Sequence, residues 1–437
     1  MKSFTHALTR RQLLLDGGKL AVSTGLLGSF LAACGGASPS SNAATNALAY
    51  WALNYEPKGA NQTGKLTDAA INGFMKAHTG IKVNVTGYTG DQAGFTKLTQ
   101  AIQASGTVDV FRLSADELPV LIKQKLVSPI DDFLGASDKS GIYPNLLSAV
   151  QTQGKHYAWP LWVPPIGMYI NLDIFKERNV DPPSDDWTYE QFVDTAKRLT
   201  FTRSNGQKVY GYTGIIDPAA INTWPIILSD GALPFNQDNT KYTFNSPEGI
   251  SGLQKLADLA LKHKVTPPDF GTQASSDIVT GFSQTKTYAM YSAPSGDAAT
   301  YKAAGLNFDV KAMPIGGLGK HVTAGGIGLI AVATIQDQER LKQAMQLADY
   351  LTSAQVGKDV SGYYLAPGAR QSITVDDPIS KFTPFVAYCY IPPLISQWTQ
   401  IRTILHPQIQ QAVLGKISPA QALNGPASEI NSLLAGS

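Results

Sequence analysis

Segments with the periodicity of strands and of helices alternate along the chain after residue 47. Short apolar or alternating runs are typical of β-strands, and apolar side chains three or four positions apart are typical of helices. Strand-like segments lie at 48–53, 81–85 and 108–111, and helix-like segments at 67–78, 95–104 and 118–126. A regular strand–helix order indicates helices layered on a largely parallel sheet, so the sequence predicts an α/β fold.

The same order continues through the rest of the chain. Further strands are expected at 168–171, 287–291 and 325–333, and further helices at 173–177, 188–199, 246–261 and 338–351. Thr188 with Gln191 matches a capping box, and Ser246 before Pro247 is a typical helix start. We expect the C-terminal region beyond these helices to be helical with proline breaks. A chain of 437 residues exceeds one hydrophobic core, which predicts two domains.

The N-terminus has the three parts of an export signal in the expected order. Arg10-Arg11 forms a basic start, an apolar run follows, and small residues end the segment. The paired arginines fit the twin-arginine route. The run Leu31-Ala32-Ala33-Cys34-Gly35 resembles a bacterial lipoprotein signal, in which cleavage precedes a cysteine that carries lipid. The resemblance implies a signal peptide over 1–33 and a lipidated Cys34, and the small polar residues of 34–47 predict a flexible tether.

Removing the signal changes the charge balance. Residues 1–33 hold four of the 35 Lys and Arg side chains and one of the 33 Asp and Glu side chains, which leaves 31 basic and 32 acidic. A net charge of −1 gives no electrostatic reason to bind nucleic acid or an anionic membrane. No later segment reaches the length of a membrane span, so we expect membrane contact only through the lipid on Cys34.

The second cysteine, Cys389, lies in the apolar run 385–390. If Cys34 carries lipid, Cys389 has no partner with which to form a disulfide. We therefore expect Cys389 to be a buried structural thiol rather than a nucleophile.

The sequence lacks the usual patterns of catalysis and metal binding. The histidines after the signal are widely separated, and no Gly-x-Ser-x-Gly occurs. The glycine-rich stretches 316–320 and 325–328 lack phosphate-loop spacing, and we interpret the second as close backbone packing or a ligand-facing turn. We therefore expect no catalytic residue, no metal site and no cofactor. Acidic pairs such as Asp131-Asp132 fit capping roles, although a glycosidase-like carboxylate pair stays open.

Aromatic residues at predicted strand ends and in loops are the remaining candidates for chemistry. Aromatic faces stack on the C–H faces of sugars, and polar ring tips supply hydrogen bonds. We assign Trp159 and Trp187 to packing. The candidate set is Trp51, Tyr55, Trp162, Trp224, Tyr291, Tyr363, Tyr364 and Trp398.

From about residue 51 to 434 the order of motifs resembles the substrate-binding proteins of bacterial ABC sugar importers, the family that includes the maltodextrin-binding proteins. The segments that carry the resemblance are Val108-Asp109-Val110-Phe111, Gly154-Lys155-His156-Tyr157-Ala158-Trp159-Pro160-Leu161, Asp186-Trp187-Thr188-Tyr189-Glu190-Gln191-Phe192, Thr223-Trp224-Pro225, Tyr288-Ala289-Met290 and Ser396-Gln397-Trp398.

The resemblance implies a two-lobed periplasmic-binding-protein fold of type II with discontinuous lobes. It implies lobe 1 at 48–163 plus 295–350 and lobe 2 at 164–294 plus 351–437. Ligand is expected in the cleft between the lobes, with closure about a hinge that traps it.

Family ligand positions and the aromatic set together give the expected binding residues. They are Trp51, Asn54, Tyr55, Arg112, Asp116, Trp162, Asn222, Trp224, Tyr291, Gly325, Tyr363, Arg370 and Trp398. Pro164-Pro165 stands where maltodextrin binders carry an acidic residue, and Arg112 where an aromatic is expected. These departures argue against maltodextrin itself and would suit an acidic sugar or a phosphorylated polyol bound through Arg112 and Arg370.

The resemblance implies a lipid-anchored receptor, on the periplasmic side or at the cell surface, that delivers a mono- or oligosaccharide to an ABC permease. We expect a monomer without catalytic activity. The alternatives are a binder of an acidic or phosphorylated polyol and, more remotely, an exported polysaccharide-degrading enzyme.

Overall fold

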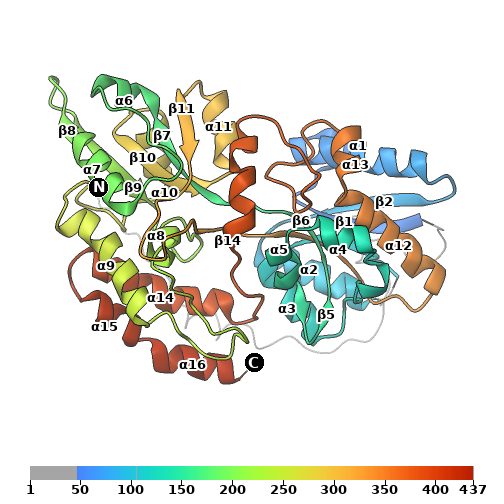
Figure 1. The fold of residues 1–437 in the computed structure, drawn as a ribbon. Coiled ribbons are helices and arrows are strands. Elements are labelled where there is room, and N and C mark those ends of the chain that lie inside the picture. The colour runs from blue at the N-terminus through green and yellow to red at the C-terminus, as the bar shows by residue number, and fades with distance from the viewer. Residues whose placement is uncertain (1–46, 105, 437) are drawn as a thin grey trace, which may run out of the picture. The chain divides into compact units, whose positions relative to one another are not determined.

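The structure is a computed structural model that describes residues 47–104 and 106–436. The expected signal peptide, Cys34 and nearly all of the expected tether lie outside these residues. Ala47, which we assigned to the tether, instead begins the first strand, where it pairs with Lys82. The described chain builds two sheets of five strands each, and each sheet has its own hydrophobic core. We call the sheet of β1 with its helices lobe 1 and the sheet of β7 with its helices lobe 2 (Figure 1).

The sheet of lobe 1 has the strand order β2-β1-β3-β13-β6. Its strands are β2 (Lys82–Tyr88), β1 (Ala47–Leu53), β3 (Val110–Ser114), β13 (Gly328–Val332) and β6 (Trp159–Trp162). The first three run parallel, as the strand–helix order predicts, whereas β13 is antiparallel to both of its neighbours. The expectation of a largely parallel sheet is therefore correct only for this part, because β13 and β6 enter the sheet from chain crossings rather than from strand–helix–strand units.

Helices cover both faces of this sheet and bury its apolar side chains. They are α1 (Gln62–Ala77), α2 (Gln92–Gln103), α3 (Leu118–Lys123), α4 (Ala136–Gly141), α5 (Pro144–Ala149), α12 (Gln338–Leu351) and α13 (Ala354–Asp359), with short 3-10 turns η1 (Pro57–Gly59), η2 (Ala115–Glu117) and η3 (Asp131–Phe133) and a β4 (Gln151–Thr152)–β5 (Lys155–His156) hairpin. Asp337 caps α12, since its carboxylate accepts a hydrogen bond from the Arg340 amide at 2.8 Å. The buried carboxylate of Asp109 binds the Arg340 side chain through two contacts of 2.7 Å, which ties α12 to the sheet.

The sheet of lobe 2 has the strand order β11-β7-β10-β9-β8. Its strands are β11 (Phe308–Lys311), β7 (Ile166–Asn171), β10 (Tyr288–Pro294), β9 (Lys208–Gly214) and β8 (Phe201–Thr202). Only the β10–β9 pair is parallel. Every residue of β7 is buried, because helices and loops pack on both of its faces.

The helices of lobe 2 come from two separate stretches of sequence. They are α6 (Leu172–Glu177), α7 (Tyr189–Arg198), α8 (Trp224–Leu228), α9 (Pro247–Leu261), α10 (Ser275–Ser283), α11 (Asp297–Ala303), α14 (Trp398–Val413), α15 (Pro419–Asn424) and α16 (Ala427–Ala435), with η4 (Ile379–Tyr388). The expected caps are confirmed at Thr188–Gln191 and Ser246. In Figure 1, the red C-terminal helices α14 and α15 lie against the yellow-green α9, and α16 packs on α14.

Three crossings join the lobes, at 163–166, 313–327 and 373–398, as the changes of core membership show. The second and third crossings pair through β12 (Thr323–Ala324) and β14 (Cys389–Tyr390), which run parallel. The Thr323 hydroxyl donates to the Ile166 carbonyl at 2.6 Å, so the second crossing is hydrogen-bonded to both of the others.

Two of the expected lobe boundaries differ from the boundaries that strand pairing and burial show. The segment from 295 was assigned to lobe 1, but β11 pairs with β7 as an edge strand of lobe 2. The segment from 351 was assigned to lobe 2, but Val356 and Ala369 are buried in the core of lobe 1. By core membership, the chain returns to lobe 1 between Ala324 and Ile327, and it enters lobe 2 for the last time between Cys389 and Trp398.

Candidate functional site

Two adjoining cavities lie beside the crossings: one has residues of both lobes in its wall, and the other is lined by lobe 2 and the crossings. We name them after one residue of each: the Trp398 cavity of about 160 Å³ and the Asn222 cavity of about 400 Å³. Ala219, Ile221 and Gly326 line both, so the two cavities share a wall, and we call them the joined cavities. The second crossing supplies Gly325 and Gly326, which places the hinge segment in the wall of the cavity.

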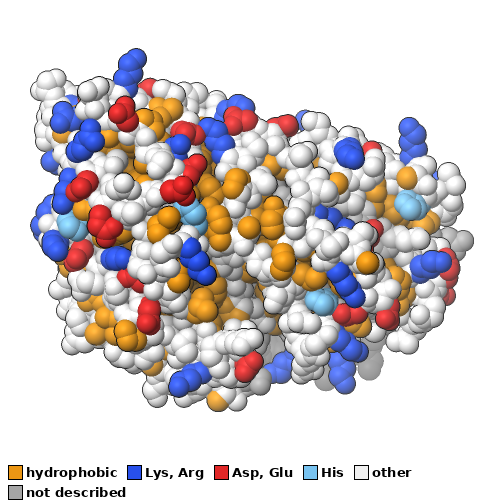
Figure 2. Space-filling model, in the orientation of Figure 1, with side chains coloured by type: hydrophobic (Ala, Val, Ile, Leu, Met, Phe, Trp, Pro, Cys, Tyr) orange, Lys and Arg blue, Asp and Glu red, His pale blue; other side chains and the backbone are white. Residues whose placement is uncertain are grey.

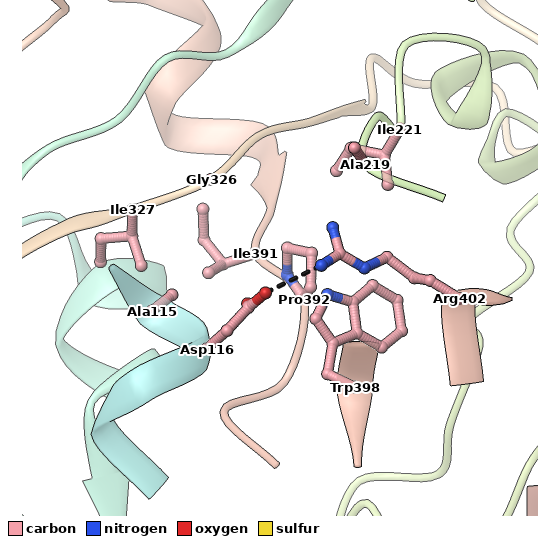
Figure 3. Close-up of a pocket in the computed structure, with 10 residues that line it drawn as sticks. All are labelled: Ala115, Asp116, Ala219, Ile221, Gly326, Ile327, Ile391, Pro392, Trp398 and Arg402. Carbon is pink, nitrogen blue, oxygen red and sulfur yellow. Dashed lines mark hydrogen bonds and ion pairs between the residues drawn. The ribbon is translucent and has the colours of Figure 1, made fainter. Parts of the chain in front are cut away.

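The Trp398 cavity contains an ion pair between the lobes (Figure 3). Asp116 follows β3 in lobe 1, and its Oδ2 lies 2.8 Å from Nη2 of Arg402, which comes from α14 of lobe 2. The Arg402 guanidinium also lies 5.6 Å from the centre of the Trp398 ring. Trp398 starts α14 and is only 2% exposed, so a ligand in this cavity can contact one edge of the indole rather than its full face.

The Asn222 cavity combines apolar walls with a few polar groups. Ile166, Ile215 and Val279 form the apolar part. The Asn222 amide donates to the Ser292 carbonyl at 3.1 Å and to the Tyr291 hydroxyl at 3.4 Å, which fixes its orientation. A concave, mostly apolar space with a few oriented polar groups is the usual form of a small-molecule site.

Asp297 also lines the Asn222 cavity, although no sequence pattern singles it out. Burial raises the pKa of its carboxyl to about 6, and the neighbouring Tyr301 hydroxyl opposes this effect. A single aspartate after a buried strand has no sequence signature, because its position in a cavity depends on where the chain turns after β10.

Gly325 is required by close packing of the crossings. A Cβ at this position would lie 2.8 Å from the Pro164 carbonyl oxygen and 3.0 Å from the Cys389 sulfur. The Gly325 amide donates to the Tyr390 carbonyl at 3.1 Å. Of our two interpretations of the 325–328 stretch, the structure shows close backbone packing at Gly325; a ligand-facing turn stays a prediction, which fits the position of Gly325 in the wall of the Asn222 cavity.

Arg112 and Trp162 form a separate cluster in lobe 1. The Arg112 guanidinium lies 4.2 Å from the centre of the Trp162 ring. Both residues, together with Tyr363, line a small cavity of about 20 Å³. Over residues 47–104 and 106–436, the Arg112 guanidinium has no carboxylate within ion-pair distance. Gly328 makes room for the indole, since a Cβ there would lie 2.5 Å from Trp162 Nε1.

Three expected ligand residues are instead engaged in packing or ion pairs. Trp224 is 1% exposed and packs against Phe244 and Trp398 in the core of lobe 2. Trp51 lies in the core of lobe 1, and its indole donates to the Thr107 carbonyl at 3.1 Å. Arg370 is paired with Asp138 and Asp349. The ligand role predicted for these three residues is corrected accordingly, since their faces or charges are already occupied.

Three further expected residues have defined partners outside the two joined cavities. Asn54 Oδ1 accepts from the Gly90 amide at 3.1 Å, and the Tyr55 hydroxyl donates to Asp68 at 2.8 Å. The Tyr363 hydroxyl donates to the Leu351 carbonyl at 3.0 Å. The structure thus brings together Asp116, Asn222, Tyr291, Gly325 and Trp398 in the joined cavities, and Arg112, Trp162 and Tyr363 in the small cavity of lobe 1.

His406 lies behind the cavity wall, where it contacts both α14 and the loop of Ala220. We did not predict a role for it from the sequence. It is 1% exposed, and its ring nitrogens lie 3.0 Å from the Arg402 and Ala220 carbonyl oxygens. These contacts connect α14 to the loop that lines both cavities. Burial lowers the pKa of the imidazole, which favours the neutral ring.

The remaining expectations concern Cys389, metal binding, membrane spans and surface charge. Cys389 is confirmed as buried, and burial raises the pKa of its thiol. In the described part of the chain, no cluster of His, Cys, Asp and Glu has the arrangement of a metal site. Among the helices of the same residues, none is long and apolar enough to cross a membrane. Basic and acidic side chains are interspersed on the face drawn in Figure 2.

Two lobes joined by three crossings, with a cavity between them, define a ligand receptor of the two-lobed binding-protein class. The chain belongs to the family of bacterial extracellular solute-binding proteins, whose model matches residues 59–358. The family and fold predicted from the sequence are confirmed, and the family consists of binding proteins rather than enzymes.

Relatives with known ligands extend this comparison. The sn-glycerol-3-phosphate-binding periplasmic protein UgpB of Pectobacterium atrosepticum is 23% identical over 406 residues, which cover 85% of this chain and 89% of the relative. The cyclic alpha-maltosyl-1,6-maltose binding protein from Arthrobacter globiformis superposes with a TM-score of 0.75 at 16% identity, over 90% of this chain and 99% of that chain. An ABC substrate-binding protein from Listeria monocytogenes in complex with cycloalternan superposes with a TM-score of 0.69 at 21% identity. The match covers 89% of this chain and 99% of that chain.

Proposed function

We propose that this protein is the receptor of an ABC importer and that it captures a carbohydrate in the joined Trp398 and Asn222 cavities. The observation that carries the proposal is a pair of adjoining cavities, one of them lined by both lobes, that together combine apolar walls, the Trp398 indole and oriented hydrogen-bonding groups. Sugars present C–H faces and hydroxyl groups, which this combination of surfaces matches. Similarity to receptors whose ligands are oligosaccharides supports the same class of ligand.

The mechanism would use the contacts between the lobes. Ligand that fills the cavity adds contacts to both lobes and therefore favours the arrangement in which they meet. Asp116 and Arg402 close one end of the space, and the paired crossings β12 and β14 form the hinge side. The arrangement with bound ligand would then be the form that docks on the permease.

The N-terminal segment completes the proposed role. An export signal over 1–33 and a lipid on Cys34 would keep the receptor outside the cytoplasm, at the membrane that holds its permease. A tether of about a dozen residues raises the encounter frequency with the permease without any added contact. We propose a monomer that has no catalytic activity.

A second candidate ligand is a phosphorylated or acidic polyol. The Arg112 guanidinium has a ring contact with Trp162 and no carboxylate partner in the described residues, so it is available to an anion. The relative from Pectobacterium atrosepticum binds sn-glycerol 3-phosphate, which is an anion of this kind. Arg370 no longer supports this alternative, because Asp138 and Asp349 already neutralise it.

Thermal unfolding with a panel of ligands tests the two candidates. The panel contains maltose, maltotriose, tagatose and sn-glycerol 3-phosphate at 50 and 500 mM NaCl. A sugar that binds should raise the melting temperature by mass action, with little effect of salt. A shift with sn-glycerol 3-phosphate alone, lost at high salt, would favour the second candidate. The absence of a shift with any carbohydrate in a wider panel would refute the proposal.

A further inference from the structure

Asp297 places a carboxylate in the wall of the Asn222 cavity. It follows Pro294, the last residue of β10, after a turn of two residues, and it is partly buried. No lysine, arginine or histidine in the described chain lies within ion-pair distance of its oxygens. Asn222, Ser275 and Tyr291 are the other polar side chains of this cavity, and none of them carries a charge at neutral pH.

A carboxylate in this setting needs hydrogen-bond donors that the protein only partly provides. Burial disfavours the charged form, the neighbouring Tyr301 hydroxyl opposes this effect only in part, and the geometry shows no hydrogen bond from that hydroxyl. A carboxylate has two oxygens that together accept several hydrogen bonds. The cavity beside it has a volume of about 400 Å³, so a ligand in this space can supply the missing donors.

The geometry points to Asp297 as the residue that selects the ligand in the Asn222 cavity: we propose that it accepts hydrogen bonds from hydroxyl groups of an uncharged polyhydroxy ligand. The inference rests on the proposed function and names the chemistry of one part of the site. Two neighbouring hydroxyls of a sugar ring can donate to the two carboxylate oxygens, while the Asn222 amide fixes the orientation beside them.

The same carboxylate should exclude anionic groups from this cavity. A carboxylate or phosphate of the ligand would face Asp297 in a space where no cation offsets the repulsion, and nearby like charges are costly at low dielectric. Any anionic group of a ligand would therefore have to lie away from the Asn222 cavity. The Asn222 cavity would therefore hold uncharged hydroxyl groups, whereas Arg112, which could hold an anion, lines a different cavity.

Ionisation of Asp297 gives the proposal a second readout. The titratable groups that face it are Tyr301 on its own helix, Tyr291 on β10 and Tyr169 on β7, and burial raises the pKa of all three hydroxyls. They stay neutral between pH 5 and 8, so Asp297 is the group that titrates there. Because the pKa of its carboxyl is about 6, hydroxyl donors should bind more weakly as the pH falls below 6.

The test compares wild type with Asp297→Asn, Asp297→Ala and the matched control Asp277→Asn. Asp277 is an exposed acid in the first turn of the neighbouring α10, outside the cavity. Calorimetry measures the dissociation constant of the panel sugar that binds wild type most tightly, from pH 5.0 to 8.0. Hydrogen bonds to a charged group predict about 10- to 100-fold weaker binding for both Asp297 variants, and no change for Asp277→Asn.

Wild type should lose about tenfold in affinity between pH 7.5 and 5.0, whereas Asp297→Asn should show a flat profile. The Asn variant should also melt at a higher temperature without ligand, because it removes a buried charge that lacks a cation. If wild type binds a sugar and Asp297→Asn binds it equally well with the same pH profile, the inference about Asp297 is wrong and the proposed function stands. If wild type binds no carbohydrate, the proposed function itself fails.

Discussion

The ion pair between Asp116 and Arg402 should stabilise the arrangement in which the lobes meet, and replacing Asp116 by Asn tests this. Asp116 belongs to lobe 1 and Arg402 to lobe 2, and their contact of 2.8 Å crosses the Trp398 cavity. The Asn side chain keeps nearly the same size and removes the charge. A ligand that requires the lobes to meet should then bind less tightly, because the arrangement that it needs has lost a stabilising contact.

The exposure of the two side chains sets the size of the effect. The Arg402 side chain is 15% exposed and the Asp116 side chain 39%, so solvent screens the pair in part. Exposed pairs contribute about 0.2–1 kcal/mol, and removal of one partner of a fully buried pair costs about 3–5 kcal/mol. For this partly screened pair we expect about 1 kcal/mol, which is about a fivefold increase in the dissociation constant.

A double-mutant cycle separates this contact from other effects of either side chain. The variants are Asp116→Asn, Arg402→Gln and the double variant, each titrated by calorimetry with the same panel sugar. The Arg402 variant also loses the ring contact with Trp398, which the cycle subtracts. Rising salt should reduce the coupling. A coupling below about 0.2 kcal/mol, or tighter sugar binding by Asp116→Asn, would refute the assigned role of the pair.

Three further substitutions have outcomes that follow from packing. Asp109→Asn should lower the free energy of unfolding by about 1–3 kcal/mol in urea titrations, because the Arg340 side chain, which is 28% exposed, loses its buried carboxylate partner; unchanged stability would contradict this. Gly328→Ala should cost about 1–3 kcal/mol and shift the fluorescence of Trp162, since the new Cβ meets the indole; an unaltered spectrum would argue against the contact. Trp398→Ala should destabilise lobe 2 by about 3–5 kcal/mol as well as weaken ligand binding, and equal stability to wild type would show that the indole is not part of the core.

Local sequence signals predicted the individual helices and strands well. The expected helix 338–351 coincides with α12, because apolar spacing and the Asp337 cap act within the segment itself. The expected capping box at Thr188 and Gln191 starts α7 for the same reason. These signals depend on residues a few positions apart, so they can be recognised without knowledge of the tertiary structure.

Features that depend on contacts between residues far apart in the sequence were harder to predict. Nothing local distinguishes β11 as an edge strand of lobe 2, because its partner β7 lies more than 130 positions earlier in the chain. Aromatic type and loop position suggested Trp224 as a ligand residue, but its burial comes from Phe244 and from Trp398 on a distant helix. The family resemblance did select Asp116, Asn222 and Trp398, which lie at the joined cavities after β3, after β9 and at the end of the third crossing.

Asp297 shows what the sequence could not convey. An acidic residue after Ser295-Gly296 is typical of a turn or a helix start, and the sequence offers no sign that it faces a cavity. The raised pKa of its carboxyl and the absence of a nearby cation among the described residues become visible only in the fold.

A crystal structure of the protein with the panel sugar that binds most tightly is the most direct test of the account. We expect density for the sugar in the joined Trp398 and Asn222 cavities, with hydroxyl groups within hydrogen-bond distance of Asp297 and Asn222 and part of the ring against Trp398. A ligand bound outside these cavities, or an anionic group seated against Asp297, would contradict the account.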